Sequence, residues 1–355
     1  MSGGDPASHL LSNGRYTVAL GSTAAWNGLA LTSAAGLVVY VRDLDRGVFW
    51  CIGDRPVRRP AHRYEVRYRP GVVTVERLDD EIESRFDGAV ARDADAEIRS
   101  IVLVNRSSRA RRIDVTTYAE VVLNDAAAHA AHPAFSKLFV ETAVAGDGVL
   151  LARRRARSQG ERTPWLVHAL AGEGPLERET DRARFLGRGR SAASPLALVS
   201  GVPLSGTVGS VLDPVLSLRR TVTLAPGETA RLVALLGAAD TREAAVALAA
   251  RDADAVLAGA EARERALLDR LGLSEMDAER FGALGAAILG GRPVPRPDDL
   301  PRAEEYWRAE GFAIDASALR MPIGDRRTPV ARAFVPATPG PAADRKAEPL
   351  SFDIG

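Results

Sequence analysis

Apolar and polar residues alternate along the middle of the chain, and the alternation is clearest over residues 112–123. In an extended chain one side carries Ile113, Val115, Thr117, Ala119, Val121 and Leu123, and the other side carries Arg112, Asp114, Thr116, Tyr118 and Glu120. A period of two is typical of a β-strand with one packed face. Residues 98–104 show the same pattern, and residues 105–108 favour a turn between the two segments. We therefore expect the middle of a large antiparallel β-sandwich, whose second face meets a sugar, another domain or water.

Further strands are expected on both sides of this region. Turn residues at short spacing separate apolar runs, which favours a sandwich or barrel over a parallel α/β sheet. A loop containing His129 and His132 should precede a short strand at residues 138–140, and residues 179–190 should form a loop rich in glycine and arginine. Residues 219–224 and 229–236 flank a plain turn and predict a hairpin. The other expected strands are residues 15–20, 37–41, 48–52, 64–69, 72–78, 82–91 and 164–171.

The pattern changes to a helical one at Asp240. Asp240, followed by Glu243, can cap a helix that runs through Ala-, Leu-, Arg- and Glu-rich sequence to residue 271, where Gly272 is a natural stop. A second helix is expected over residues 277–289, and only residues 303–309 look helical beyond it. The predicted organisation is an all-β dominated fold: a flexible N-terminus at 1–10, a large antiparallel β-sandwich (a supersandwich) at 11–239, a helical linker at 240–290 and a weakly ordered, Pro/Arg-rich tail at 291–355.

Composition narrows the class of protein. The chain has 355 residues, with 47 Lys and Arg against 46 Asp and Glu, so its formal charge of +1 gives no field that attracts nucleic acid or an anionic membrane. Its single cysteine, Cys51, cannot form an internal disulfide, which favours a reducing compartment. The N-terminus does not resemble a signal peptide, and no apolar run is long enough to span a bilayer. We expect a cytoplasmic protein without membrane insertion.

Five segments occur in one order along the chain: LSNGRYTV at 11–18, VTTYAEVVL at 115–123, AHPAFSKLFVET at 131–142, ETDRARFLGRGR at 179–190 and PLSGTVGSVLDPVLSLRR at 203–220. Together they resemble the N-terminal β-supersandwich region of glycoside hydrolase family 94, formerly glycosyltransferase family 36. The likeness is greatest to the phosphorylase-like part of cyclic β-1,2-glucan synthases, and cellobiose phosphorylases share the architecture. The resemblance covers roughly residues 11–289.

The resemblance also implies what this chain lacks. In that family linker helices and an (α/α)6 barrel follow the sandwich, and the barrel carries the general acid and most of the phosphate and sugar site. The sequence after residue 289 is too short for such a barrel. Relatives carry a longer loop near Trp26, whereas residues 21–36 here are small and nearly featureless. Relatives are often dimers, so a homodimer is expected by analogy.

Several side chains are candidates for contact with a sugar. Tyr118 and Glu120 share a strand face, but alternation alone produces that arrangement, so an ordinary solvated or interdomain face is the simpler interpretation. His129 and His132 lack further ligands at zinc spacing, so no metal is expected, and no cofactor motif is present. Arginines in 182–190 suit anionic partners, although neighbouring acids can pair with them. The candidate carbohydrate-binding residues are Arg15, Tyr16, Trp26, Tyr118, Glu120, His132, Lys137, Arg184 and Arg188.

Two classes of function remain open. The first is a non-catalytic, carbohydrate-associated module that binds a β-glucan oligosaccharide or scaffolds a partner. The second is one part of a split glycoside phosphorylase or glycosyltransferase whose catalytic barrel lies on another chain. Sugar phosphorolysis needs an acid at the glycosidic oxygen and a clamp on phosphate. The sequence places neither, so we name no catalytic residue and expect no turnover by this chain alone.

Overall fold

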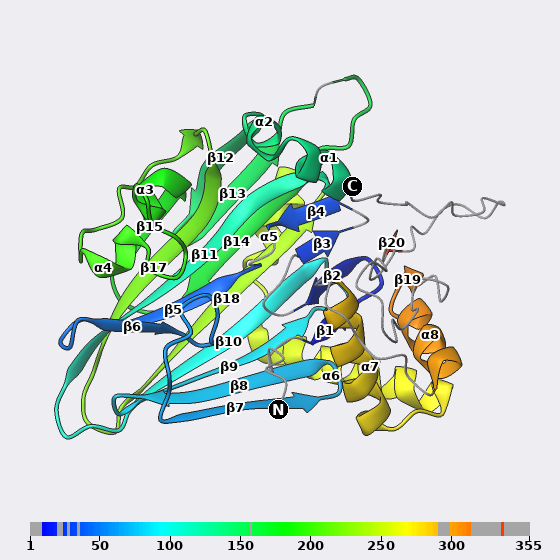
Figure 1. The fold of residues 1–355 in the computed structure, drawn as a ribbon, viewed down its shortest axis with the longest axis horizontal. Helices are drawn as coiled ribbons and strands as arrows, with labels where there is room; N and C mark the ends of the chain where they lie inside the picture. Colours follow the sequence, from blue (N-terminus) through cyan, green and yellow to red (C-terminus); the bar gives the residue numbers. More distant parts are fainter. Residues whose placement is uncertain are drawn as a thin grey trace, which may run out of the picture.

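Two antiparallel β-sheets of nine strands each lie face to face and form the body of the molecule (Figure 1). The computed structural model describes residues 9–19, 24–26, 29–33, 36–156, 158–289, 299–313 and 335–336. The first sheet has the order β1-β2-β3-β4-β11-β17-β15, and β5 pairs with β11 and carries β6. The second sheet has the order β16-β12-β13-β14-β18-β10-β9-β8-β7. The predicted antiparallel β-sandwich followed by helices is therefore confirmed.

The strands of the first sheet are β1 Leu10–Ser12, β2 Tyr16–Ala19, β3 Ala24–Trp26, β4 Leu29–Thr32, β5 Val38–Asp43, β6 Val48–Cys51, β11 Arg111–Asp125, β15 Leu176–Asp181 and β17 Pro214–Leu224. Those of the second sheet are β7 Arg63–Arg69, β8 Val72–Asp79, β9 Ile82–Val90, β10 Ala96–Asn105, β12 Val140–Gly146, β13 Val149–Arg154, β14 Trp165–Ala171, β16 Gly209–Ser210 and β18 Thr229–Ala239. A separate pair joins β19 Phe312–Ala313 to β20 Val335–Pro336.

The helices are α1 Ala126–Ala131, α2 Pro133–Lys137, α3 Arg182–Leu186, α4 Leu196–Val199, α5 Arg242–Leu248, α6 Ala253–Leu271, α7 Glu275–Leu289 and α8 Leu300–Ala309. Helices α5 and α6 cover the outer face of the second sheet, where α5 contacts β14 and β18 and α6 contacts β9 and β10. The segment with α3 and α4 lies over the outer face of the first sheet, and α7 and α8 close the end of the sandwich at β1 (Figure 1).

One apolar core fills the space between the sheets. The side of β11 that alternation assigns to a packed face is buried as expected, with Ile113 and Val115 each 0% exposed. The polar member of that row, Thr117, lies 2.6 Å from Nε2 of His168 on the opposite sheet, and His168 Nδ1 donates to the Leu235 carbonyl at 2.8 Å. Because the carbonyl only accepts, this geometry fixes the tautomer with the proton on Nδ1. The two sheets are thus joined by a buried polar bridge as well as by apolar packing.

The hairpin predicted for residues 219–236 is wrong. Strand β17 pairs with β11 and β15 in the first sheet, whereas β18 pairs with β10 and β14 in the second, so the turn between them is a corner that crosses the sandwich. The β10–β11 connection crosses beside it. Asn105 Nδ2 donates to the carbonyls of Leu224 at 2.9 Å and Ala225 at 3.2 Å, which ties the two corners together. The prediction failed because a short polar turn between two apolar segments looks the same in the sequence whether the two strands pair in one sheet or lie in different sheets.

The helical region differs from its prediction in one respect. A single helix capped by Asp240 is expected, but the structure has two. Thr241 caps α5 by accepting from the Ala244 amide, and Asp252 caps α6 by accepting from the Ala255 amide. A side chain that caps a helix N-terminus stabilises a new helix start, so the chain begins a second helix at Asp252 and does not continue the first. Gly272 ends α6 in a left-handed conformation with φ 62°, as predicted.

Two other local predictions are corrected. The histidine loop and the strand expected at 138–140 are instead two short helices, α1 and α2, followed by β12 from Val140. Asp125 caps α1 and Pro133 begins α2, which are standard helix-start residues. The loop expected at 179–190 contains the end of β15 and then α3, which is capped by Asp181.

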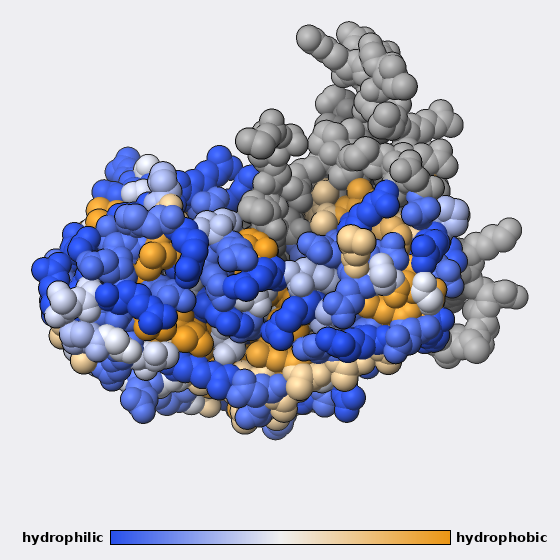
Figure 2. Space-filling model, turned by 90° about the horizontal axis from the view of Figure 1, so that it is seen from below, coloured by the Kyte–Doolittle hydropathy of each residue, from blue (hydrophilic) through white to orange (hydrophobic). Residues whose placement is uncertain are grey.

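The edge of the second sheet is protected by charge. Strand β7 exposes alternate residues along its length, namely Arg63, Glu65, Arg67 and Arg69. Charged side chains on an edge strand discourage pairing with another chain. Figure 2 shows the molecule from below, where hydrophilic residues cover most of the face and hydrophobic residues form separate patches.

Candidate functional site

Four charged side chains gather on the outer side of the first sheet, at the end of β11. The strand carries a bulge between Val121 and Asn124, and Leu123 takes a positive φ of 48°. The chain then turns through the short helices α1 and α2, so that Lys137 at the end of α2 comes back over Glu120 of β11. Arg182 at the start of α3 and Asp213 just before β17 complete the group, which we call the Glu120 cluster.

Short contacts connect all members of the Glu120 cluster. Glu120 Oε1 accepts from Tyr118 Oη at 2.8 Å and from Arg182 Nε at 2.7 Å, and Glu120 Oε2 lies 4.0 Å from Lys137 Nζ. Lys137 Nζ donates to Asp213 Oδ1 at 2.7 Å, and Arg182 Nη1 lies 3.4 Å from Asp213 Oδ2. Two acids and two bases therefore alternate around a closed ring, and each acid contacts both bases.

The surroundings favour the ionised form of Glu120. Burial alone would raise the pKa of Glu120, but the hydrogen bonds from Arg182 and Tyr118 outweigh it and keep the pKa below its ordinary value. Burial and the neighbouring Glu120 raise the pKa of Tyr118. Burial lowers the pKa of the nearby His129, and Lys137 lowers it further. The Glu120 carboxylate therefore stays ionised at neutral pH, and its bonds are those of a structural ion-pair ring.

The structure changes the interpretation of the outer face of β11. Tyr118 is 0% exposed, because Phe185 of α3 stacks on its ring with centroids 4.5 Å apart and an interplanar angle of 25°. Tyr40 of β5 donates to the Ala192 carbonyl at 2.8 Å in the same covering segment. Much of the face expected to meet water or a sugar is thus packed under the chain's own residues 182–213.

The remaining candidate residues are dispersed. Tyr16 is fully buried and donates to Glu97 and to the Leu236 carbonyl, so its ring faces no solvent. Arg15 is exposed and pairs with Asp95 at 3.0 Å. Trp26 belongs to β3, but its side chain lies outside the described residues.

The other two candidate regions lie on the surface. His132 is exposed between α1 and α2, next to the Glu120 cluster. Arg184 is exposed and lies 3.7 Å from Asp181, and Arg188 is exposed in the turn after α3. The structure therefore brings Tyr118, Glu120 and Lys137 into one cluster.

The candidate set omits two members of the Glu120 cluster, Arg182 and Asp213. A signal for both exists in the sequence. Each of the four charged members comes from a different segment among the five that carry the family resemblance: Glu120 from 115–123, Lys137 from 131–142, Arg182 from 179–190 and Asp213 from 203–220. Four of the five segments that carry the resemblance each contribute one charged residue to this cluster, so their common occurrence was a signal that they meet in space.

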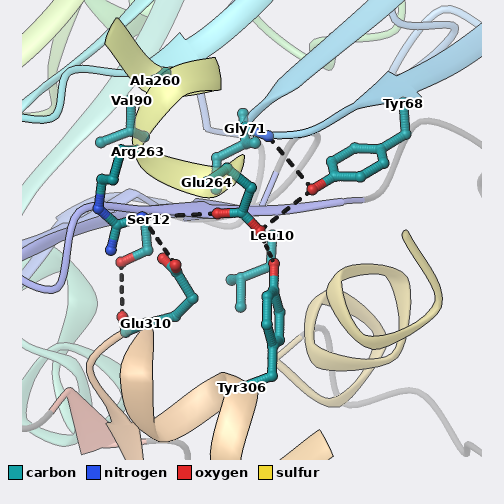
Figure 3. Close-up of a pocket in the computed structure, with 11 residues that line it drawn as sticks. Leu10, Ser12, Tyr68, Gly71, Val90, Ala260, Arg263, Glu264, Tyr306 and Glu310 are labelled. Carbon is teal, nitrogen blue, oxygen red and sulfur yellow. Dashed lines mark hydrogen bonds and ion pairs between the residues drawn. The ribbon is translucent and has the colours of Figure 1, made fainter. Parts of the chain in front are cut away.

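A second polar cluster lies at the helical end, and sequence patterns did not indicate it. Glu264 of α6 and Glu310, just after α8, are 4% and 3% exposed and line a cavity with Arg263 and Tyr306 (Figure 3). The cavity holds about 10 Å³, roughly one water molecule. A sugar ring does not fit in that space, so this pair of carboxylates is not a glycoside-cleaving site.

Within the described ranges, no group of three or more His, Cys, Asp and Glu side chains is arranged to hold a metal ion. The described helices also include none that is long and apolar enough to cross a membrane.

The two nine-stranded antiparallel sheets and the helices that follow them define a β-supersandwich domain. Residues 3–255 match the family model described as "Glycosyl hydrolase 94, supersandwich domain", and the chain therefore belongs to this family. This confirms the resemblance seen in the sequence.

Two relatives show the extent of the similarity. The chain is 36% identical over 251 residues to the cyclic beta-(1,2)-glucan synthase NdvB of Rhizobium meliloti (strain 1021), covering 66% of this chain and 9% of that protein. It is 30% identical over 207 residues to the solabiose phosphorylase of Paenibacillus borealis, covering 58% of this chain and 26% of that protein. The fold is similar to that of a bacterial glucoamylase complexed with acarbose, with a TM-score of 0.50, 7% identity, and coverage of 82% of this chain and 42% of that one.

Proposed function

We propose that this chain is a carbohydrate-associated supersandwich module of a family 94-type glucan phosphorylase or cyclic β-1,2-glucan synthase system, and that it catalyses no reaction alone. The observation that carries the proposal is the closed Glu120 cluster. Glycoside hydrolysis uses two carboxyl groups that flank an open space for the sugar, and phosphorolysis needs a free acid and a free clamp on phosphate. Here Lys137 and Arg182 are paired with Glu120 and Asp213, so the cluster offers neither arrangement.

Contact with a sugar is proposed at the rim of this cluster. Phe135 of α2 is 57% exposed, and in the sequence it lies between the exposed His132 and Lys137, a member of the cluster. An exposed ring gives an apolar surface for the C–H face of a pyranose, and the adjacent polar groups suit its hydroxyls. The cluster would then act as a rigid support for the rim, because its four charges hold α2, α3 and the segment before β17 together.

Titration with β-1,2- and β-1,4-gluco-oligosaccharides, followed by calorimetry, tests this contact. We expect binding in the millimolar range or tighter, and a loss of at least tenfold in affinity for Phe135→Ala. Met276→Ala is the matched control, because Met276 is 77% exposed on α7, at the other end of the molecule. If neither sugar series binds at millimolar concentration, carbohydrate association through this module is wrong.

A second candidate function is supported by the distribution of exposed apolar side chains. Nine large ones are exposed among the described residues, and eight of them lie between residues 135 and 212. In Figure 1, α2 and β12 from this stretch lie at the top of the molecule and α3 and α4 at its left. Concentrated exposed apolar residues mark interaction surfaces. The eight are Phe135, Leu138, Val144, Leu196, Val199, Val202, Val208 and Leu212.

We propose a helical catalytic barrel on a separate chain as the partner of this surface, because the matched relatives are several times longer than the region they share with this chain. Sedimentation of the chain with the barrel part of such a relative should show a complex that Val202→Ser with Leu212→Ser weakens. Wild-type sedimentation alone gives the baseline and tests the expected homodimer. Persistence of the complex in the double variant would contradict the assignment of the surface. A cytoplasmic location remains part of the proposal and fits the single buried thiol of Cys51.

A further inference from the structure

Helix α8 is docked on the end of the sandwich through its apolar side. Trp307 is 0% exposed and donates from Nε1 to the Phe281 carbonyl of α7 at 2.9 Å. Leu10 of β1 and Phe281 pack in the same apolar group. The helix therefore joins the region beyond the sandwich to the first strand of the chain.

The other half of this contact is polar and enclosed (Figure 3). Arg263 Nη1 donates to Glu310 Oε1 at 2.8 Å and lies 3.7 Å from Glu264 Oε2. Glu264 Oε1 accepts from Tyr306 Oη at 2.7 Å and is 3.5 Å from Tyr68 Oη. The contacts join α6, β7 and the end of α8, which are distant in sequence.

The charges in this enclosure do not balance when both acids are ionised. Glu310 faces Arg263 and Glu264 of α6 and Tyr306 of α8. Tyr68 of β7 lines the same cavity. Two carboxylates then share one guanidinium group in a cavity of about 10 Å³, so one negative charge has no counter-charge from the described part of the chain.

Among the residues that the structure describes, the other neighbours supply no positive charge. His9 stacks on the Tyr68 ring with centroids 4.0 Å apart, and burial lowers the pKa of His9 to about 3, so this imidazole is neutral. Ser12 of β1 donates its hydroxyl to the Glu310 backbone carbonyl at 2.9 Å. Burial raises the pKa values of both tyrosines, which keep their protons.

We propose that these groups form a proton-dependent clasp, in which α8 is docked while the Glu264–Glu310 pair holds one proton and is released when that proton passes to solvent. In the docked state the shared proton removes the unbalanced charge. In the released state water reaches both carboxylates, and the apolar seat at Leu10 and Phe281 is uncovered. The proposal goes beyond the function proposed above and does not depend on it.

The direction of the pH response follows from the two states. Burial, offset in part by Arg263 and reinforced by Glu264, raises the pKa of Glu310 from its ordinary 4.5 to about 8 in the docked state. A released carboxyl group has its ordinary pKa, so the docked state binds the proton more tightly. Docking is therefore strongest at acidic pH and weakens as pH rises toward 8, by at most tenfold in the docking equilibrium per pH unit for one proton.

Hydrogen exchange of the α8 amides, normalised to their intrinsic rates, measures docking across pH 5.5–9.5 in the full chain. We expect protection to fall from pH 5.5 upward, by at most tenfold per pH unit, and to level off above about pH 8, while amides of the central strand β11 stay protected. Glu310→Gln cannot ionise and leaves Glu264 balanced by Arg263, so its α8 protection should not change with pH. Glu264→Gln should do the same, because Glu310 then pairs with Arg263 alone. Glu305→Gln, an exposed change on α8, should behave as wild type.

Three results would overturn the clasp. The first is wild-type α8 that stays fully protected at pH 9.5. The second is a transition in both Gln variants that matches the wild type. The third, which needs no variant to fold, is a Glu310 carboxyl group that titrates near pH 4.5 in carbon-13 NMR of the wild-type chain.

Discussion

Asn105 is expected to be one of the residues on which the sandwich most depends, because it joins the two corners where the chain crosses between sheets. Its side chain is 0% exposed. Nδ2 donates to the carbonyls of Arg109 at 2.8 Å, Leu224 at 2.9 Å and Ala225 at 3.2 Å. Oδ1 accepts from the Ser107 amide at 2.9 Å. The change Asn105→Ala removes all of these partners without altering either strand.

The magnitude follows from the groups left behind. A buried carbonyl or amide that loses its partner costs about 1–3 kcal/mol, and water reaches only part of this corner. If one carbonyl and one amide are left without any hydrogen-bond partner, the free energy of unfolding falls by about 3 kcal/mol. Asn105→Asp should lose at least as much, because it turns a carboxylate oxygen toward the Leu224 and Ala225 carbonyls.

Urea unfolding followed by far-UV circular dichroism measures this loss. Arg109→Ala is the matched control: it keeps the backbone carbonyl that Asn105 contacts and removes only an exposed side chain. We expect the control to stay within about 0.5 kcal/mol of wild type. An Asn105→Ala variant as stable as the control would refute the role assigned to the corner.

Three further predictions concern single side chains. Burial lowers the pKa of His168 from 6.5 to about 4, so the free energy of unfolding should fall by about 3 kcal/mol as pH drops from 6.5 to 4. In urea unfolding at stepped pH, His168→Leu should lose this pH dependence. An unchanged pH dependence in the variant would count against a buried neutral imidazole. Glu120→Gln should cost about 1–2 kcal/mol at pH 7, because Arg182 and Lys137 lose one of the two acids that they share. Thermal unfolding that matches wild type would contradict the ring of ion pairs. Trp307→Ala should cost about 3–5 kcal/mol locally and make α8 sensitive to trypsin, whereas a resistant α8 would show that the helix is held by other contacts.

Local strand structure could be predicted from the sequence, but sheet membership could not. Alternation over residues 112–123 identified β11 and its packed face, because one strand's period of two is a local property. Whether β17 and β18 form a hairpin or a corner depends on partners elsewhere in the chain, β10 and β11, and no local signal records them.

The candidate site shows the same limit. Tyr118 and Glu120 were found on one strand face, yet the cover that buries Tyr118 comes from Phe185, a residue in a segment expected to be a loop. Lys137 and Asp213 meet across 76 residues of sequence, and only the shared family segments connect them. Glu310 lies in a segment expected to be an irregular tail, so its pairing with Glu264 could not be anticipated.

Phosphorus-31 NMR of the purified chain with inorganic phosphate and a β-1,2- or β-1,4-gluco-oligosaccharide tests the central claim most directly. The Glu120 cluster is closed by its own bases, so the account predicts that only the inorganic phosphate signal is present after prolonged incubation. A sugar phosphate signal that grows in proportion to the concentration of the chain, and that disappears in Glu120→Gln, would contradict it.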